Sequence, residues 1–262
     1  METPVPDLTL TVLGSSPSWP NPGGACSGYL VAAGDSRVLL DCGPGVVGRV
    51  RAAVDLRELR AVVISHMHPD HYLDLVVLRH AIKYGKLRGE PLDVYVPPGG
   101  LGTLRKLGDA LASDPAFFDG ALTIREYDPM RPLAFGSMRV ELREVVHYVP
   151  CFAMRVQAAG RTLVFSGDAA PCEALVEHAR GADVLLAEAA IRHPSDDAAD
   201  PAPRGHLTPA EAGDMARRAG VGRLLLTHAP IDADDPDRVA REAATAFAGP
   251  VERVVDGRTY AI

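Results

Sequence analysis

The sequence predicts a mixed α/β (α+β) fold in which β-sheets are covered by helices. Short apolar runs rich in β-favouring residues recur along the chain, and helical patterns lie between several of them. The first quarter is typical of an antiparallel meander, which argues against an all-parallel fold. The predicted strands cover residues 8–14, 28–33, 37–41, 61–65, 92–96, 138–146, 152–157, 162–166, 183–188 and 223–227.

Helical periodicity and capping residues predict the elements between these strands. The pattern indicates helices over residues 71–84, 101–112, 171–180, 208–219 and 236–247. The helix at 208 has a complete start signal, with Thr208 as N-cap, Pro209 at the first helical position and Glu211 at the third. The polar, proline-containing stretch 192–205 is typical of a surface loop, and it comes directly before His206.

Composition and charge narrow the class of protein. The chain has 262 residues, 47% hydrophobic and 23% charged, which is ordinary for a globular protein, and we expect one domain over 1–262. Its formal charge of −7 argues against a broad basic face for extended nucleic acid, and favours a small-molecule substrate. Without a leader-like N-terminus or a membrane-length apolar run, we expect a cytoplasmic protein with no membrane partner. Four widely spaced cysteines, expected to be reduced, are Cys26, Cys42, Cys151 and Cys172.

Polar residues follow four of the apolar runs. "VVIS" precedes His66, "LVFSG" precedes Asp168, "VLLA" precedes Glu188 and "LLLT" precedes His228. In sheet-plus-helix proteins, functional groups gather beyond the carboxyl ends of strands, where loops open a crevice. We therefore expect these four chain segments to build one site.

The segment His66-x-His68-x-Asp70-His71 predicts metal binding. Imidazole nitrogens and carboxylate oxygens suit zinc, manganese or iron. Clustering so many ionisable groups beside a buried strand is costly unless a cation compensates them. One ion could not easily use all four groups, so the arrangement indicates two divalent metals, with zinc expected first and manganese as the alternative.

Taken together, these motifs resemble the metallo-β-lactamase superfamily. The resemblance rests on H-M-H-P-D-H, on the later His147, on "SGD" ending at Asp168 and on "LLLTH" ending at His228, and it covers nearly the whole chain. It implies an αββα sandwich of two mixed β-sheets flanked by helices, with a dimetal site at one edge. The implied metal ligands are His66, His68 and His147 for one ion, Asp70, His71 and His228 for the other, and Asp168 between them.

The segments around Glu188 and His206 resemble the ribonuclease Z branch of this superfamily. There, a glutamate and a histidine outside the metal shell assist phosphodiester cleavage. More closely still, "SGYLV", "LLDCGPGV", "SGDAA" and "GHLTPAEAG" are similar to the bacterial cyclic-nucleotide (cAMP) phosphodiesterases of this fold. The resemblance implies hydrolysis of a 3′,5′-cyclic nucleotide such as cAMP or cGMP.

The implied mechanism gives roles to three residues. Two ions about 3.5–4 Å apart can share a bridging water and convert it to hydroxide near neutral pH. Asp70 would orient this hydroxide, and His206 would protonate the leaving O3′ while Glu188 favours the charged imidazole. Alternatively, Glu188 and His206 only brace the metal site from outside.

Two further functions compete with the cyclic-nucleotide reading. One is a ribonuclease Z-type tRNA 3′-processing endonuclease, although the chain is acidic and residues 86–137 leave no obvious room for a tRNA-gripping arm. The other is a non-catalytic nucleotide-binding protein on the same fold. Relatives on this fold often form homodimers, but no segment identifies an interface.

Overall fold

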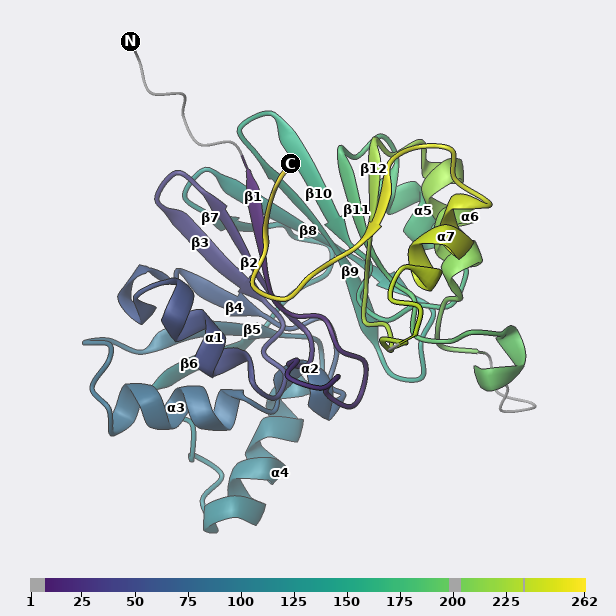
Figure 1. Ribbon diagram of the computed structural model, residues 1–262. Coiled ribbons are helices and arrows are strands. Elements are labelled where there is room, and N and C mark those ends of the chain that lie inside the picture. The colour runs from purple at the N-terminus through teal and green to yellow at the C-terminus, as the bar shows by residue number, and fades with distance from the viewer. Residues whose placement is uncertain (1–7, 198–203, 233) are drawn as a thin grey trace.

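The computed structural model describes residues 8–197, 204–232 and 234–262, and two β-sheets lie face to face at its centre (Figure 1). The first sheet has seven strands in the order β14-β1-β2-β3-β4-β5-β6. Its strands are β1 (Thr9–Gly14), β2 (Gly28–Ala33), β3 (Ser36–Leu40), β4 (Ala61–Val63), β5 (Leu92–Val96), β6 (Leu122–Glu126) and β14 (Thr259–Ala261).

The second sheet also has seven strands, in the order β13-β12-β11-β10-β9-β8-β7. Its strands are β7 (Leu133–Phe135), β8 (Met138–Val145), β9 (Cys151–Ala158), β10 (Arg161–Phe165), β11 (Val184–Glu188), β12 (Arg223–Thr227) and β13 (Val251–Arg253). In both sheets an antiparallel part continues into a parallel part, at β3–β4 in the first and at β10–β11 in the second. Both sheets are therefore mixed, as predicted.

Helices cover the outer face of each sheet. Those on the first sheet are α1 (Val46–Ala53), α3 (Leu75–Lys83) and α4 (Gly100–Ala112), and those on the second are α5 (Glu173–Ala179), α6 (Pro209–Ala219) and α7 (Arg238–Ala244). The short helices η1 (Leu56–Glu58), α2 (Pro69–Tyr72) and η2 (Pro194–Asp197) lie in connecting loops. The result is the αββα sandwich, and the fold prediction is confirmed.

Strand β4 shows why the predicted strands are continuous apolar runs. Ala61 and Val63 pack in the core between the two sheets, whereas Val62 packs in the core under the helices. A strand buried on both faces has no polar side to reveal its alternation.

In the described residues, no helix is long and apolar enough to cross a membrane.

Several boundaries differ from the sequence prediction. The helix expected over 71–84 is broken into α2 and α3, and the meander ends at β3, because α1 follows and β4 pairs parallel to β3. The prediction missed α1, β6, β7, β13 and β14. The helix start at Thr208 is confirmed, since its side chain accepts from the Glu211 N–H and the Glu211 carboxylate accepts from the Thr208 N–H.

Candidate active site

The loops after neighbouring strands bring the predicted site residues together at one edge of the sandwich. His66, His68, Asp70 and His71 lie in the loop and α2 that follow β4 in the first sheet. Three loops of the second sheet supply the rest: His147 follows β8, Asp168 follows β10 and His228 follows β12. Both sheets therefore contribute to one site, as the pattern of strand ends predicted.

The seven side chains form two groups that share Asp168. One group contains His66, His68, His147 and Asp168, and the other contains Asp70, His71, Asp168 and His228, with donor atoms within 4.8 Å of one another in each. In the first group, His68 Nδ1 lies 3.1 Å from His66 Nε2 and 3.0 Å from His147 Nε2. In the second, Asp168 lies 3.4 Å from Nε2 of both His71 and His228. This is the division that the family resemblance implied.

Two buried atoms at the centre of the site have no hydrogen-bond partner among the described residues. They are His71 Nε2 and Asp168 Oδ1, which lie 3.4 Å apart. A buried polar atom without a partner costs about 1–3 kcal/mol, so most native groups avoid this state. A divalent ion would satisfy both atoms, and nitrogen and oxygen donors are what zinc and manganese accept. The residues therefore fit a pair of metal ions.

The charge states of the histidines agree with this fit. Burial lowers the pKa of His66 and of His68, and the positive charge of a neighbouring imidazole lowers each of them further. Burial also lowers the pKa of His147, despite the opposing charge of Asp168. These three imidazoles are consequently neutral, which is the form that binds metal.

Asp168 and His71, in the second donor group, favour positive charge at the site. Burial alone would raise the pKa of Asp168, but the charges of His228 and His71 hold it well below its usual range. Burial alone would lower the pKa of His71, but Asp168 and Asp41 raise it well above its usual range. A proton or a metal ion can meet this demand for positive charge.

Hydrogen bonds outside the site orient four of the ligand-type histidines. His71 Nδ1 donates to Asp41 Oδ2 over 2.7 Å, and His147 Nδ1 donates to the Gly205 carbonyl over 2.8 Å. His66 Nδ1 lies 3.0 Å from Ser65 Oγ, and His228 Nδ1 lies 3.1 Å from Ser27 Oγ. With Nδ1 occupied in this way, each of these rings turns Nε2 toward the centre. Such outer bonds fix the tautomer and orientation of metal-binding histidines.

The sequence analysis missed Asp41, the most connected of these outer residues. Asp41 is fully buried, and besides His71 it accepts hydrogen bonds from Ser65 N over 2.7 Å and from Ser65 Oγ over 2.8 Å. Its backbone φ of 59° lies in the left-handed region, which Asp tolerates better than most residues. A signal was present, because "RVLLD" is a fifth apolar run that ends on a carboxylate.

Glu188 and His206 form a hydrogen-bonded pair beside the shared carboxylate. Glu188 is 0% exposed, and its Oε1 accepts from His206 Nδ1 over 2.9 Å. The same Nδ1 lies 3.9 Å from Asp168 Oδ2. Burial alone would lower the pKa of His206, but the hydrogen bond and charge of Glu188, with the charge of Asp168, raise it to about 9. His206 is therefore protonated at neutral pH.

The start of loop 192–205 fixes the backbone of His206. Asp197 Oδ2 accepts hydrogen bonds from the N–H groups of Gly205 and His206, both over 2.8 Å. The loop thus flanks the site, and its residues 198–203 lie outside the described residues. Tyr148, which is 44% exposed, places its ring centre 5.9 Å from that of His206. It is available to contact a substrate at the rim.

Comparisons with known proteins agree with the geometry. Residues 36–229 match a family described as "Beta-lactamase superfamily domain". The chain is 36% identical to the uncharacterized protein ML1173 of Mycobacterium leprae, over 97% of this chain and 89% of the relative. It is 30% identical to the probable metallo-hydrolase YhfI of Bacillus subtilis, over 95% of this chain and 98% of the relative.

A solved structure and a named enzyme are also similar to this chain over nearly its whole length. The crystal structure of YhfI from Bacillus subtilis superimposes with a TM-score of 0.83, covering 97% of this chain and 99% of that one at 29% identity. A ribonuclease Z of Myxococcus xanthus is 31% identical, over 96% of this chain and 97% of the relative. That alignment extends over 303 positions although the chain has 262 residues, so the relative contains positions with no counterpart here.

Proposed function

This chain belongs to the beta-lactamase superfamily, and from that premise we propose that it is a dinuclear metal-dependent phosphodiesterase that hydrolyses a 3′,5′-cyclic nucleotide such as cAMP or cGMP. The observation that carries the proposal is the pair of donor groups joined at Asp168, with the Glu188–His206 pair beside them. The two donor groups alone would be enough to bind metal ions. The charged His206 beside them adds a proton donor, which a reaction with a poor leaving group needs.

The metal roles follow the two donor groups. His66, His68 and His147 would hold one ion, Asp70, His71 and His228 the other, and Asp168 both. When bound, two divalent ions lower the pKa of water and offset negative charge on a phosphoryl group.

The chain's own residues supply the proton transfers. His206 Nδ1 is held by Glu188, and no hydrogen bond to Nε2 is found within the described residues, so Nε2 is the atom that can protonate the departing O3′. Buried Glu188 keeps this imidazole charged, and Asp197 holds its backbone. Asp70, whose Oδ2 lies 3.3 Å from His71 Nε2, would also accept a hydrogen bond from the attacking water.

The ribonuclease Z-type reaction is the second candidate, and the 31% identity to such an enzyme favours it. Two features favour the smaller substrate instead. The formal charge is −7, and half of residues 86–137 lie in β5, α4, β6 and β7, which belong to the sandwich. An RNA-processing enzyme needs a surface that neutralises phosphates.

One assay separates the candidates. Purified protein is supplied with zinc or manganese and offered cAMP, cGMP, cyclic dinucleotides and precursor tRNA in parallel. We expect turnover of a cyclic mononucleotide that disappears with chelator. Cleavage of precursor tRNA with steep salt dependence would establish the second candidate instead. Absence of any metal-dependent hydrolysis, including that of an aryl phosphodiester, would leave a non-catalytic nucleotide-binding protein.

A further inference from the structure

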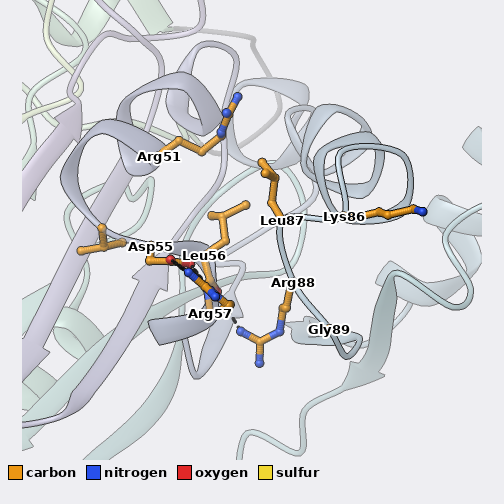
Figure 2. A pocket seen from close by; sticks show the side chains of 9 residues that line it. Arg51, Asp55, Leu56, Arg57, Lys86, Leu87, Arg88 and Gly89 are labelled. Atoms are coloured by element: carbon orange, nitrogen blue, oxygen red, sulfur yellow. Dashed lines mark hydrogen bonds and ion pairs between the residues drawn. The ribbon is translucent and has the colours of Figure 1, made fainter.

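A basic pocket lies at the end of β4 opposite the candidate active site. Its walls come from Arg51 in α1, from residues 54–57 before and within η1, and from residues 86–89, which follow α3 (Figure 2). These segments precede β4 and β5, whereas His66 to His71 follow β4. The pocket is therefore separate from the metal-binding groups.

The charge of this pocket is opposite to that of the chain. Arg51, Arg57, Lys86 and Arg88 line it, with Asp55 as the one lining carboxylate. Arg57 Nε donates a hydrogen bond to Asp55 Oδ1 over 3.0 Å. Arg51 and Lys86 have no ion-pair partner among the described residues. Four cations against one carboxylate, on a chain with a formal charge of −7, make a local site for anions.

Arg88 forms the fixed part of the pocket. Its side chain is 8% exposed, and its Nη1 donates to the carbonyls of Leu56 and Leu59 over 2.8 and 2.9 Å. Its Nη2 lies 3.2 Å from Glu90, a carboxylate that is 78% exposed. Its buried Nε has no partner among the described residues. Arg88 therefore keeps one charged N–H unsatisfied in the part of the chain that the structure describes.

The size and the apolar lining indicate more than a simple inorganic ion. The cavity volume is about 570 Å³, within the range of small-molecule sites. Val54, Leu56 and Leu87 add apolar surface between the basic groups. Figure 2 shows Arg88 reaching toward the turn at Leu56, while Arg51 and Lys86 come from two other segments of the wall and extend outward from it.

We propose that this pocket binds a small phosphorylated molecule, whose phosphate meets the arginines and whose apolar body rests on Leu87 and Val54. A guanidinium matches phosphate oxygens in a two-pronged geometry, and Arg51 is an arginine of this pocket with no ion-pair partner among the described residues. The site lies away from the proposed reaction and does not depend on it.

The test uses ADP as the probe, with inorganic pyrophosphate and adenosine for comparison, titrated calorimetrically into the purified full chain. We expect saturable ADP binding, weaker binding of pyrophosphate, and binding of adenosine weakened about tenfold or more, because phosphate contacts are the strong ones. Absence of saturable ADP binding, or equal affinity for adenosine, would overturn the proposal.

Variants locate the binding. We expect Arg51→Ala/Lys86→Ala to weaken ADP binding about tenfold. Both side chains are exposed and unpaired among the described residues, so the fold is retained, and Arg88 is left intact because it holds the turn. The matched control is Arg105→Ala/Lys106→Ala on α4, which removes the same charge from another exposed face.

A fourth protein, His68→Ala, alters the candidate metal site. ADP affinity should be unchanged in it and in the α4 control. Loss of ADP binding in His68→Ala, or equal losses in the two double variants, would contradict the proposal. A short single-stranded RNA is titrated into the same variants. If Arg51→Ala/Lys86→Ala weakens binding of the RNA but not binding of ADP, the pocket binds nucleic acid and the proposal of a small molecule is wrong.

Discussion

Glu188→Gln tests how the buried carboxylate acts on His206. In the parent protein the pKa of His206 is raised from 6.5 to about 9, which corresponds to about 3 kcal/mol of preference for the charged imidazole. Replacing the carboxylate by an amide removes the charge that raises this pKa and leaves only a neutral amide oxygen to accept from His206 Nδ1, which is a weaker hydrogen bond. Burial, which acts to lower it, then dominates.

The pKa of His206 determines how turnover depends on pH. A proton donor with a pKa of about 9 is charged through neutral pH and loses its proton as the pH rises through 9. In Glu188→Gln the loss should occur about two pH units lower, so that turnover at about pH 8 falls roughly tenfold. The same pair stabilises the parent fold fully below about pH 6.5, and this stabilisation disappears as the pH rises through about 9.

The assay is kcat/KM for the cyclic nucleotide as a function of pH, at saturating metal. Glu90→Gln, which removes an exposed carboxylate, is the matched control and should keep the parent profile. An aryl phosphodiester, whose leaving group needs no proton, should lose little in either Glu188→Gln or His206→Ala. An alkaline limb that stays in place in Glu188→Gln, or equal losses for both substrates in His206→Ala, would refute the proton-donor role.

Three further changes test other parts of the structure. Asp41→Asn should weaken metal binding about 10–100-fold in a chelator competition, because it disturbs the bond that orients His71, and unchanged affinity would count against that orienting role. Asp168→Asn should reduce the metal content of both groups together, measured by elemental analysis, whereas loss of a single ion would show that Asp168 does not bridge. Thr208→Ala should lower the free energy of unfolding by about 1 kcal/mol in denaturant melts, since it removes the α6 cap. The control is Thr103→Ala in the first turn of α4, which removes a threonine hydroxyl that donates to the Gly99 carbonyl and caps no N–H group.

The long central strands could be predicted from sequence, whereas short and peripheral elements could not. Strands such as β10 and β12 are continuous apolar runs because both of their faces are buried. β7, β13 and β14 have three residues each and lie at or beside sheet edges, so too few side chains carry a pattern. Helix α1, with the sequence VVGRVRAA, contains three valines and a glycine and lacks a side-chain cap, so its local preferences do not indicate a helix.

The candidate site likewise contains residues that the sequence reveals and residues that it does not. His66, His68, Asp70 and His71 are close in sequence, so their spacing alone indicates metal, and the family resemblance supplies the distant residues. The outer partners are ordinary residues far from what they touch: Asp41 is 30 residues from His71, and Ser27 is 201 residues from His228. Such contacts are decided by the tertiary fold, and a serine in a turn carries no sign of them.

The packing of the two sheets explains how donors from opposite halves of the chain can meet without metal. Directly under the site, Tyr29 Oη of the first sheet lies 2.6 Å from Thr227 Oγ1 of the second, next to His228. The Phe152 N–H of the second sheet donates to the Ser65 carbonyl over 3.1 Å, next to His66. These two hydrogen bonds join the sheets at the residues adjoining the ligands, and the apolar core between the sheets holds them together. The scaffold thus sets the distance between the donor groups, and because each group takes donors from both sheets, bound ions would tighten the same contact.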